Sequence, residues 1–151
     1  MELESYITGF VDGEGCFTVS FSKRAKLKTG IEVRPSFSIS QNRKSKAVLE
    51  EIQKYFGCGF VRFSRGDQTY KYEVRSMKEI KDKVIPHFEK YPLKTNKLQD
   101  FTIFKEIVNL VSENKHRNTE YLKEIVEKSY LMNGSGKRKY KKEDLLKLLA
   151  R

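Results

Sequence analysis

The chain has 151 residues, a length that allows one domain with a hydrophobic core and is short for two ordinary domains. Lys and Arg number 31 against 20 Asp and Glu, which gives a net charge of +11, and the aromatic content of 12% argues against a disordered polycation. A polyanion is the expected partner, with nucleic acid ahead of an anionic membrane surface; a merely basic, solvated surface is the third interpretation. No apolar stretch approaches the roughly 20 residues of a spanning helix and no signal peptide opens the chain, so we expect a soluble, intracellular protein without a membrane partner.

The first predicted element is a helix over residues 3–11, where apolar side chains recur with i, i+3, i+4 spacing. We expect it to end in the glycine-rich segment 12–15. The apolar period then becomes two over residues 17–22 and 31–40, which predicts two half-buried antiparallel strands. A very basic loop, residues 23–30, joins them.

The same two patterns return in the second half of the chain. Helical spacing predicts a helix over 45–56, stopped by Gly57, and alternation predicts a second hairpin with a turn around Arg65-Gly66-Asp67. Further helices are expected at 78–85, about 95–113, 118–132 and 143–149, with Pro86 and Pro92 in the turn between the first two. Residues 133–142 carry two Gly and five Lys or Arg, which is typical of a mobile basic loop.

This order of elements predicts an α+β fold with the order αββαββα. Two near-duplicated αββ units would form one four-stranded antiparallel sheet, with helices on one face and the other face open. We expect a single domain over residues 1–151, with its core at about 3–132 and a basic loop and short C-terminal helix over 133–151.

The open face of this sheet is the candidate nucleic-acid surface. Any one-sided sheet presents polar residues to water, which is the plain alternative. However, a mixture of Ser, Thr, Arg, Lys and Glu can address base edges and phosphates, and a twisted antiparallel ribbon fits the major groove. The residues predicted to contact double-stranded DNA, on the strands and their adjoining turns, are Ser20, Ser22, Arg24, Lys26, Lys28, Glu32, Arg34, Ser36, Ser38, Arg43, Arg62, Ser64, Arg65, Thr69, Lys71, Glu73 and Arg75.

The first helix contains two glycines four residues apart, Gly9 and Gly13. A mid-helix glycine costs about 1 kcal/mol relative to Ala, so something must offset Gly9. Two glycines on one stripe let a second helix approach closely, whereas the alternative is a helix stop at Gly13 with an incidental Gly9. The first interpretation predicts a two-fold dimer interface formed by Ile7, Gly9, Phe10, Asp12 and Gly13.

Glu14 is the candidate metal ligand, because its carboxylate emerges at the end of this helix between Gly13 and Gly15. Two packed helices would place Glu14 beside its symmetry mate, and one carboxyl group would then protonate unless a divalent cation lay between them. Mg²⁺ suits that place, because it takes carboxylate, phosphate and water oxygens and supports phosphodiester hydrolysis.

Residues 7–15, Ile-Thr-Gly-Phe-Val-Asp-Gly-Glu-Gly, resemble the motif of the LAGLIDADG homing endonucleases, although only Gly9, Asp12 and Gly15 match its letters. The spacing to the following elements is similar to that of the single-motif, homodimeric members over residues 3–112. The resemblance implies a DNA-binding saddle formed by the sheet. It also implies that Glu14 is the metal-binding catalytic acid, that the carbonyl of Gly13 is a second metal ligand, and that Asp12 caps the partner's helix.

The resemblance further implies two catalytic residues outside the motif. Gln41 would order solvent near the scissile phosphate, and Lys97 would polarise the nucleophilic water or stabilise phosphate charge. Lys94 is a rival of Lys97, and a solvated surface lysine is the plain alternative for either. Family members often carry an Arg where a gapless comparison places Ser45, and the candidates to replace it are Arg43, Lys44 and Lys46.

The function expected from the resemblance is that of a site-specific DNA homing endonuclease. A homodimer would bind a long, near-palindromic duplex and hydrolyse both strands with Mg²⁺, leaving 3′ overhangs, and Ca²⁺ would support binding without cleavage. The alternatives are a non-cleaving maturase or regulator of the same fold, which the acid at Glu14 disfavours, and an isolated half of a two-motif protein. An intron-encoded origin in a mitochondrion, a chloroplast or a prokaryotic cytoplasm would be in keeping with the resemblance.

Overall fold

The computed structural model describes residues 2–133 and 138–150. The chain forms two compact units, one of Met1–Phe17 with Ser36–Leu98 and the other of Thr18–Pro35 with Gln99–Arg151. The expectation of a single domain stays a prediction. The basic loop expected at 133–142 falls partly on residues 134–137, which lie outside the described residues.

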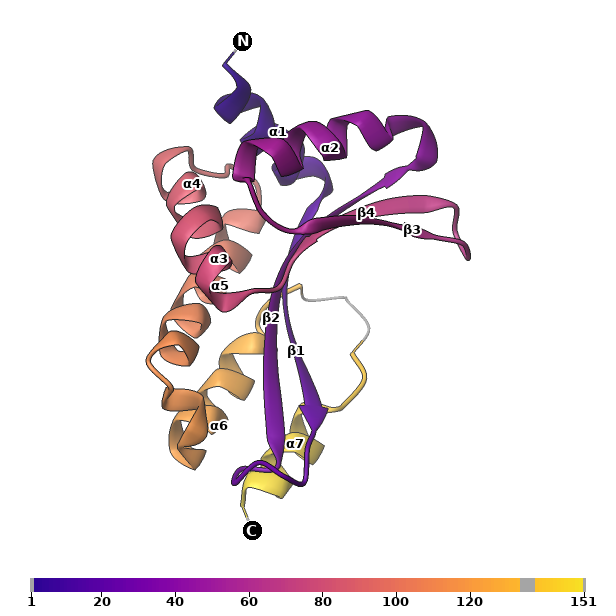
Figure 1. Cartoon of the computed structure of the whole chain (residues 1–151). Coiled ribbons are helices and arrows are strands. Elements are labelled where there is room, and N and C mark those ends of the chain that lie inside the picture. Colours follow the sequence, from indigo (N-terminus) through magenta and orange to yellow (C-terminus); the bar gives the residue numbers. More distant parts are fainter. Residues whose placement is uncertain (1, 134–137, 151) are drawn as a thin grey trace. The chain divides into compact units, whose positions relative to one another are not determined.

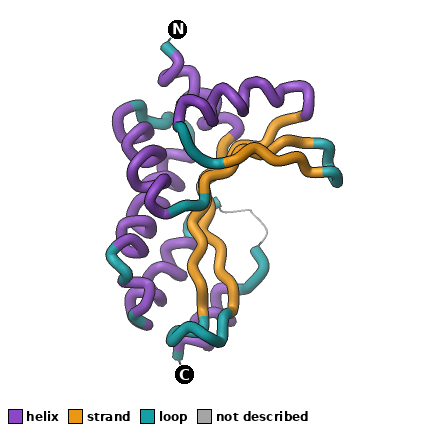
Figure 2. Tube along the Cα trace, viewed as in Figure 1, coloured by secondary structure: helices purple, strands orange, loops and turns teal. Residues whose placement is uncertain are grey.

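The strands form one sheet in the order β1-β2-β4-β3, and β4 is antiparallel to both of its neighbours. Figure 2 shows the loop that joins β1 to β2 and the shorter turn that joins β3 to β4. A four-stranded antiparallel sheet with helices confirms the predicted α+β class. The strands are β1 (Gly15–Lys23), β2 (Ile31–Asn42), β3 (Phe60–Ser64) and β4 (Thr69–Val74).

Helix α2 (Lys46–Phe56) covers one side of the β3–β4 hairpin (Figure 1). It follows a short 3₁₀ turn, η1 (Arg43–Ser45), and buries Leu49, Ile52 and Phe56. Gly57 ends it in the left-handed conformation, with φ of 68°, as the sequence predicted. The helical spacing of the apolar residues therefore identified the face that packs on the sheet.

An aromatic cluster forms the core of this first unit. The ring of Phe37 lies 5.3 to 6.3 Å from the rings of Phe17, Phe56, Tyr72 and Phe88. None of the five side chains is more than 5% exposed. Edge-to-face and offset contacts of this kind add to the stability gained from burial alone. The inward strand positions predicted by alternation, Phe17 and Phe37, thus lie at the centre of the core.

The helix expected at 78–85 is longer than predicted and runs to Lys90 through three segments. These are α3 (Met77–Glu79), the π-helical turn η2 (Ile80–Val84) and α4 (Ile85–Lys90). The prediction that Pro86 ends the helix was wrong. Pro86 lies in the first turn of α4, where a missing N–H costs little, and the wider π turn precedes it.

The remaining helices agree with the sequence prediction to within a few residues. Asn118 caps α6 by accepting hydrogen bonds from the backbone N–H groups of Glu120 and Tyr121. Within the described part of the chain, no helix has the length and apolar character needed to cross a bilayer. These helices are α5 (Lys97–Ser112), the 3₁₀ turn η3 (Lys115–Arg117), α6 (Thr119–Ser129) and α7 (Lys142–Leu149).

His87 joins three helices of the first unit through a chain of hydrogen bonds. Its Nε2 lies 3.0 Å from Oγ1 of Thr8, and the Tyr55 hydroxyl is 2.8 Å from its Nδ1. The Thr8 hydroxyl donates to the carbonyl oxygen of Tyr91 at 2.9 Å, so it accepts from Nε2–H, and Tyr55 donates to Nδ1. Both nitrogens of the neutral ring are satisfied. Burial lowers the pKa of His87 to about 4, although the charge of Glu4 opposes the shift.

This shift predicts that the protein loses stability in mild acid. Between pH 6.5 and about 4, His87 is protonated in the unfolded chain but stays neutral in the folded protein. The free energy of unfolding therefore falls as pH falls through this window, by up to about 3 kcal/mol. Urea unfolding at pH 7.5, 5.5 and 4.5 should show this loss of stability. The free energy of unfolding of His87→Gln should depend less on pH. A His87→Gln chain with the wild-type pH dependence would assign the loss to other groups.

Candidate active site and nucleic-acid interface

The motif helix α1 (Leu3–Glu14) ends within the glycine-rich segment 12–15, as predicted, and passes into β1 at Gly15 without a loop. A Cβ atom at residue 15 would lie 2.6 Å from Cγ1 of Val11, so only glycine fits this junction. The inward side of α1 buries Ile7, Thr8 and Val11. The prediction that Ile7 belongs to a dimer interface was wrong, because Ile7 is fully buried inside its own chain.

The opposite side of α1 is a stripe formed by Tyr6, Gly9, Phe10 and Gly13. Tyr6 and both glycines are exposed, Phe10 is half-buried, and the two aromatic rings lie 6.0 Å apart. A Cβ atom at either glycine would have no neighbour within 4 Å. Packing inside the chain therefore does not require these two glycines, and the predicted interface at Gly9, Phe10 and Gly13 stays accessible.

Asp12 fixes the end of α1 to the segment that leads into α5. Its carboxylate accepts hydrogen bonds from the backbone N–H groups of Lys94 (2.8 Å) and Thr95 (3.1 Å) and from the Thr95 hydroxyl (2.7 Å). Burial raises the pKa of Asp12, but these bonds and the charge of Lys97 outweigh it and lower the pKa overall. Both carboxylate oxygens bind the chain's own backbone, and the implied role of Asp12 in capping a partner's helix stays a prediction.

Lys97 lies at the same end of α1. Its ammonium group donates to the carbonyl oxygen of Val11 at 3.1 Å, and that oxygen also accepts the N–H of Gly15. A cation is stabilised at a helix C-terminus, where the last carbonyl groups lack helical partners. Glu14, the last residue of α1, is exposed three positions further on. The structure therefore brings Lys97 close to the motif, whereas Lys94 contributes its backbone N–H to Asp12 and exposes its side chain.

Gln41 and the basic residues after it lie at the end of β2. The Gln41 side chain is half-buried and its amide donates to the carbonyl oxygen of Ser40 at 2.9 Å. Among the rival basic residues, Lys46 places its ammonium group 4.9 Å from the ring centre of Tyr70, while Arg43 and Lys44 are exposed in η1. The catalytic roles of Gln41 and Lys97 stay predictions.

A single chain offers few ligands for a metal. Over residues 2–133 and 138–150, no three Asp, Glu, His or Cys side chains gather into a cation site. Glu14 is an exposed carboxylate at a helix end, and the neighbouring carbonyl groups are further oxygen donors. Hard divalent cations take such ligands but need more of them than this helix end provides.

The register of β4 shows which side chains share the face away from α2. Lys71 is paired with Ser40 on one side and with Arg62 on the other, and Thr69 is paired with Asn42 and Ser64. Ser40, Asn42 and Phe60 are exposed members of this face that the list of predicted contacts omitted. The period of two contained the signal, since continuing it along β2 and β3 reaches each of them.

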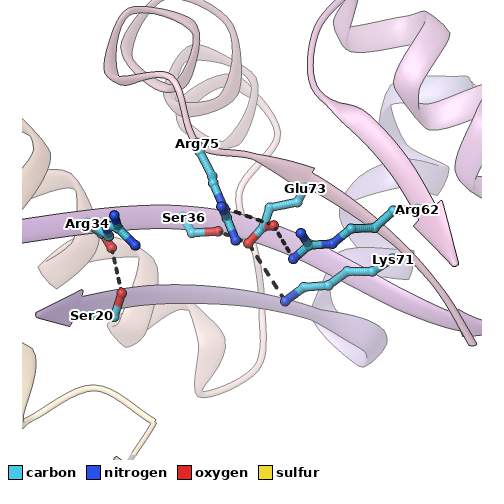
Figure 3. A network of polar contacts seen from close by, with 7 residues as sticks. All are labelled: Ser20, Arg34, Ser36, Arg62, Lys71, Glu73 and Arg75. Carbon is cyan, nitrogen blue, oxygen red and sulfur yellow. Dashed lines mark hydrogen bonds and ion pairs between the residues drawn. The ribbon is translucent and has the colours of Figure 1, made fainter. Parts of the chain in front are cut away.

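Three residues predicted to contact DNA from this face are buried, which corrects their assignment. Ser36, Ser38 and Glu73 are 8%, 7% and 3% exposed. Glu73 is covered because the basic side chains of Arg62, Lys71 and Arg75 bend over its carboxylate (Figure 3). The alternating pattern correctly placed these residues on the face away from α2, but it does not show which other side chains cover a position.

The part of the β1–β2 hairpin that belongs to the second unit, Thr18–Pro35, carries its own ion pairs. Glu32 binds Arg24 at 2.6 Å and Arg34 at 2.8 Å, and the hydrogen bond from Arg34 is the main reason that the pKa of Glu32 is lowered. Ser20 donates to the carbonyl oxygen of Arg34 at 3.4 Å (Figure 3). Arg24, Lys26, Lys28 and Arg34 are all exposed, so the predicted contacts in this hairpin are accessible.

The three bonds to Asp12 should contribute measurably to stability. We expect Asp12→Ala to lower the free energy of unfolding by about 2 kcal/mol, because two backbone N–H groups lose a charged acceptor. Urea unfolding followed by circular dichroism measures the change. Glu50→Ala, which removes the same charge from an exposed position of α2, is the control. Equal midpoints for Asp12→Ala and this control would show that the bonds add no net stability.

Comparison with known proteins identifies the family that this chain resembles. Residues 7–108 match the family model described as LAGLIDADG endonuclease. A probable intron-encoded endonuclease of Neurospora crassa is 43% identical over 130 residues, which cover 85% of this chain and 29% of the fungal protein. The chain thus spans less than a third of that relative.

Two solved structures resemble the chain over nearly its whole length. The archaeal intron-encoded homing endonuclease I-Vdi141I, complexed with DNA, has a TM-score of 0.89 at 32% identity, covering 97% of this chain and 94% of its own. I-SmaMI, bound to an uncleaved DNA target in the presence of calcium ions, has a TM-score of 0.89 at 30% identity, covering 100% of this chain and 50% of its own. With the glycine-bearing helix, the terminal acid and the four-stranded sheet, these matches show that the chain belongs to the LAGLIDADG endonuclease family.

Proposed function

We propose that this chain is a site-specific DNA endonuclease that acts as a homodimer on a long, near-palindromic duplex. The observation that carries the proposal is the exposed Glu14 carboxylate at the end of a helix whose outer stripe, Tyr6, Gly9, Phe10 and Gly13, is left open. The relative I-Vdi141I, which matches the chain almost end to end, is complexed with DNA in its solved structure. The fungal relative's name supports an intron-encoded origin.

The dimer follows from the same helix. Gly9 and Gly13 present bare backbone, so a second copy of α1 can approach the helix closely at these two positions. I-SmaMI, whose chain is about twice as long, supports the idea that two such folds act together, because this chain accounts for 50% of it. Two identical chains related by a two-fold axis would bind a target with matching symmetry.

In the proposed dimer, Glu14 and the carbonyl of Gly13 from both chains would hold Mg²⁺. These groups are oxygen donors at a helix end, and a second copy of the chain would supply the additional metal ligands that one chain lacks. The bound cation would act as a Lewis acid and lower the pKa of its water. Lys97, anchored on the Val11 carbonyl, would place a positive charge beside the scissile phosphate, and Gln41 would orient the attacking water.

The exposed basic residues of both hairpins would bind the duplex. Arg and Lys contacts to phosphate set the register, while bidentate contacts to base edges in the major groove supply specificity. Cutting both strands across the minor groove would leave 3′ overhangs. The calcium complex of I-SmaMI with uncleaved DNA supports the expectation that Ca²⁺ allows binding without cleavage.

The decisive experiment is a cleavage assay on a randomised duplex library with Mg²⁺, with Ca²⁺ and with chelator, followed by sequencing of the ends. We expect staggered cuts in a near-palindrome with Mg²⁺ alone. Glu14→Gln should lower the cleavage rate at least about a thousandfold and keep the affinity for the selected duplex within a few fold, because only the ligand charge is removed. Cleavage by Glu14→Gln would remove this residue from the site.

A matched substitution, Glu50→Gln on the exposed side of α2, should cut like the wild type. Selective binding without cutting under every condition would favour a non-cleaving maturase or regulator. Absence of duplex binding would reject the proposed function as a whole.

Gly9→Leu tests the dimer. Nothing lies within 4 Å of a Cβ atom at Gly9, so the monomer should fold with equal or higher stability, whereas the leucine side chain should keep a second α1 at a distance. Light scattering is expected to give a dimer for the wild type and a monomer for the variant. Ala47→Leu, on the exposed side of α2, adds similar bulk elsewhere and should remain dimeric. A dimeric Gly9→Leu chain would place the interface on another surface.

A further inference from the structure

A buried carboxylate lies beneath the basic side chains of the β3–β4 hairpin. Glu73 is 3% exposed, although it is on the face of the sheet that carries Lys71, Arg62 and Ser64 rather than on the face covered by α2. Its neighbours in sequence, Tyr72 and Val74, are the fully buried core positions on the other side. The burial of Glu73 therefore comes from the side chains that surround it on the polar face.

Both oxygens of this carboxylate are occupied (Figure 3). Oε1 accepts from Nη2 of Arg62 at 2.9 Å and lies 3.1 Å from Nε of Arg75. Oε2 accepts from the Ser36 hydroxyl at 2.7 Å and lies 3.7 Å from Nζ of Lys71. The partners come from β2, from β3, from β4 and from the residue that follows β4, so one side chain connects three strands of the sheet.

The charges in this cluster favour an ionised Glu73. Burial raises the pKa of Glu73, but the Ser36 hydrogen bond and the charges of Lys71 and Arg75 outweigh burial, so the pKa falls below its usual value. The carboxylate cannot itself contact a ligand of any size, because its partners cover it. Any effect on binding must therefore act through the basic residues.

Those basic residues remain available to a polyanion. The side chains of Arg62, Lys71 and Arg75 are 48%, 35% and 55% exposed. An arginine has five N–H donors, and one bond to Glu73 leaves others able to meet a base edge or a phosphate. Phe60 adds a second support for Arg62, whose guanidinium carbon lies 5.6 Å from the ring centre.

Fixing these side chains before binding changes what they recognise. A free Arg or Lys loses much rotamer entropy when it is immobilised, and it can follow phosphates of any sequence. A guanidinium group held at one oxygen presents its remaining donors in a set direction, which suits bidentate contact with a base. The side chain then loses its conformational entropy when the protein folds and not when DNA binds.

We propose that Glu73 is a positioning residue for sequence discrimination: its buried carboxylate holds Arg62, Lys71 and Arg75 so that they distinguish base pairs instead of contacting phosphates indiscriminately. The inference rests on the proposed DNA-binding function and names the device that gives this part of the surface its specificity. It assigns Glu73 an indirect role in place of the direct base contact expected from the sequence.

The test compares wild type and Glu73→Gln, both full length, in chelator so that DNA is not cut. The probes are the duplex selected by the wild type, a set of its single-base-pair variants and a random duplex, each titrated at several salt concentrations. Glu73→Gln should bind the random duplex at least as tightly as the wild type does. Its discrimination between the selected duplex and the single-base-pair variants should fall at least about fivefold, and only at a few adjacent base pairs. The logarithm of its binding constant should fall more steeply with the logarithm of the salt concentration, by about one released counterion.

Glu113→Gln is the control, since it removes the same charge from an ion pair with Lys115 outside the sheet. It should leave discrimination unchanged. Wild-type discrimination by Glu73→Gln would overturn the proposal. So would an equal loss of selected and random binding together with a lower melting temperature, because that result describes a purely structural residue.

Ser36→Ala is the milder variant if Glu73→Gln does not fold, since it removes only the hydroxyl group that orients the carboxylate. It should weaken discrimination at the same base pairs, and unchanged discrimination would again overturn the proposal. A wild type that binds no duplex would reject the proposed function, and this inference with it. A wild type that discriminates, while both variants discriminate equally well, rejects the role of Glu73 alone.

Discussion

The hydrogen bonds that lock the last turn of α1 are the interaction on which the candidate active site depends. The Asp12 carboxylate accepts hydrogen bonds from the backbone N–H groups of Lys94 and Thr95. The Val11 carbonyl oxygen accepts hydrogen bonds from the Gly15 N–H and the Lys97 ammonium group. These bonds let a helix become a strand between two consecutive residues. An acid at the final helical position therefore has a fixed backbone on both sides and a lysine anchored within one turn, which is the rigidity that catalytic groups need.

The two sides of α1 differ in their contacts within the chain. Ile7, Thr8 and Val11 are buried, and Thr8 reaches into the hydrogen-bond chain of His87. A Cβ atom at Gly9 or Gly13 would meet no neighbour within 4 Å, so close packing inside the described part of the chain does not offset their helix-weakening effect. A feature that costs local stability without improving the chain's own packing is best explained by a second molecule, and this agrees with the proposed homodimer.

Much of the fold could be predicted from periodicity, because strands and helices reveal their inward faces through the spacing of apolar residues. The errors concern partners distant in sequence. Nothing near Asp12 indicates that it binds residue 94, and nothing near Glu73 indicates that Ser36 and Arg62 will enclose it. Ile7 was misplaced because one helix carries two contact faces and its apolar residues do not say which belongs to the core. Of the candidate active site, only Glu14 and the glycines could be identified without the family resemblance, since the roles proposed for Gln41 and Lys97 depend on how separate elements meet.

The shared carboxylate of Glu73 has a consequence for how recognition could change over evolution or in the laboratory. Replacing Arg62 alone would leave a buried anion with one cation fewer, and removing one partner of a buried ion pair is costly. Substitutions at Arg62, Lys71 and Arg75 should therefore be non-additive, because each alters the charge balance that the others experience. A new target preference at this hairpin would be reached through coordinated changes that include residue 73, so the neighbouring positions would diverge as a group and not one at a time.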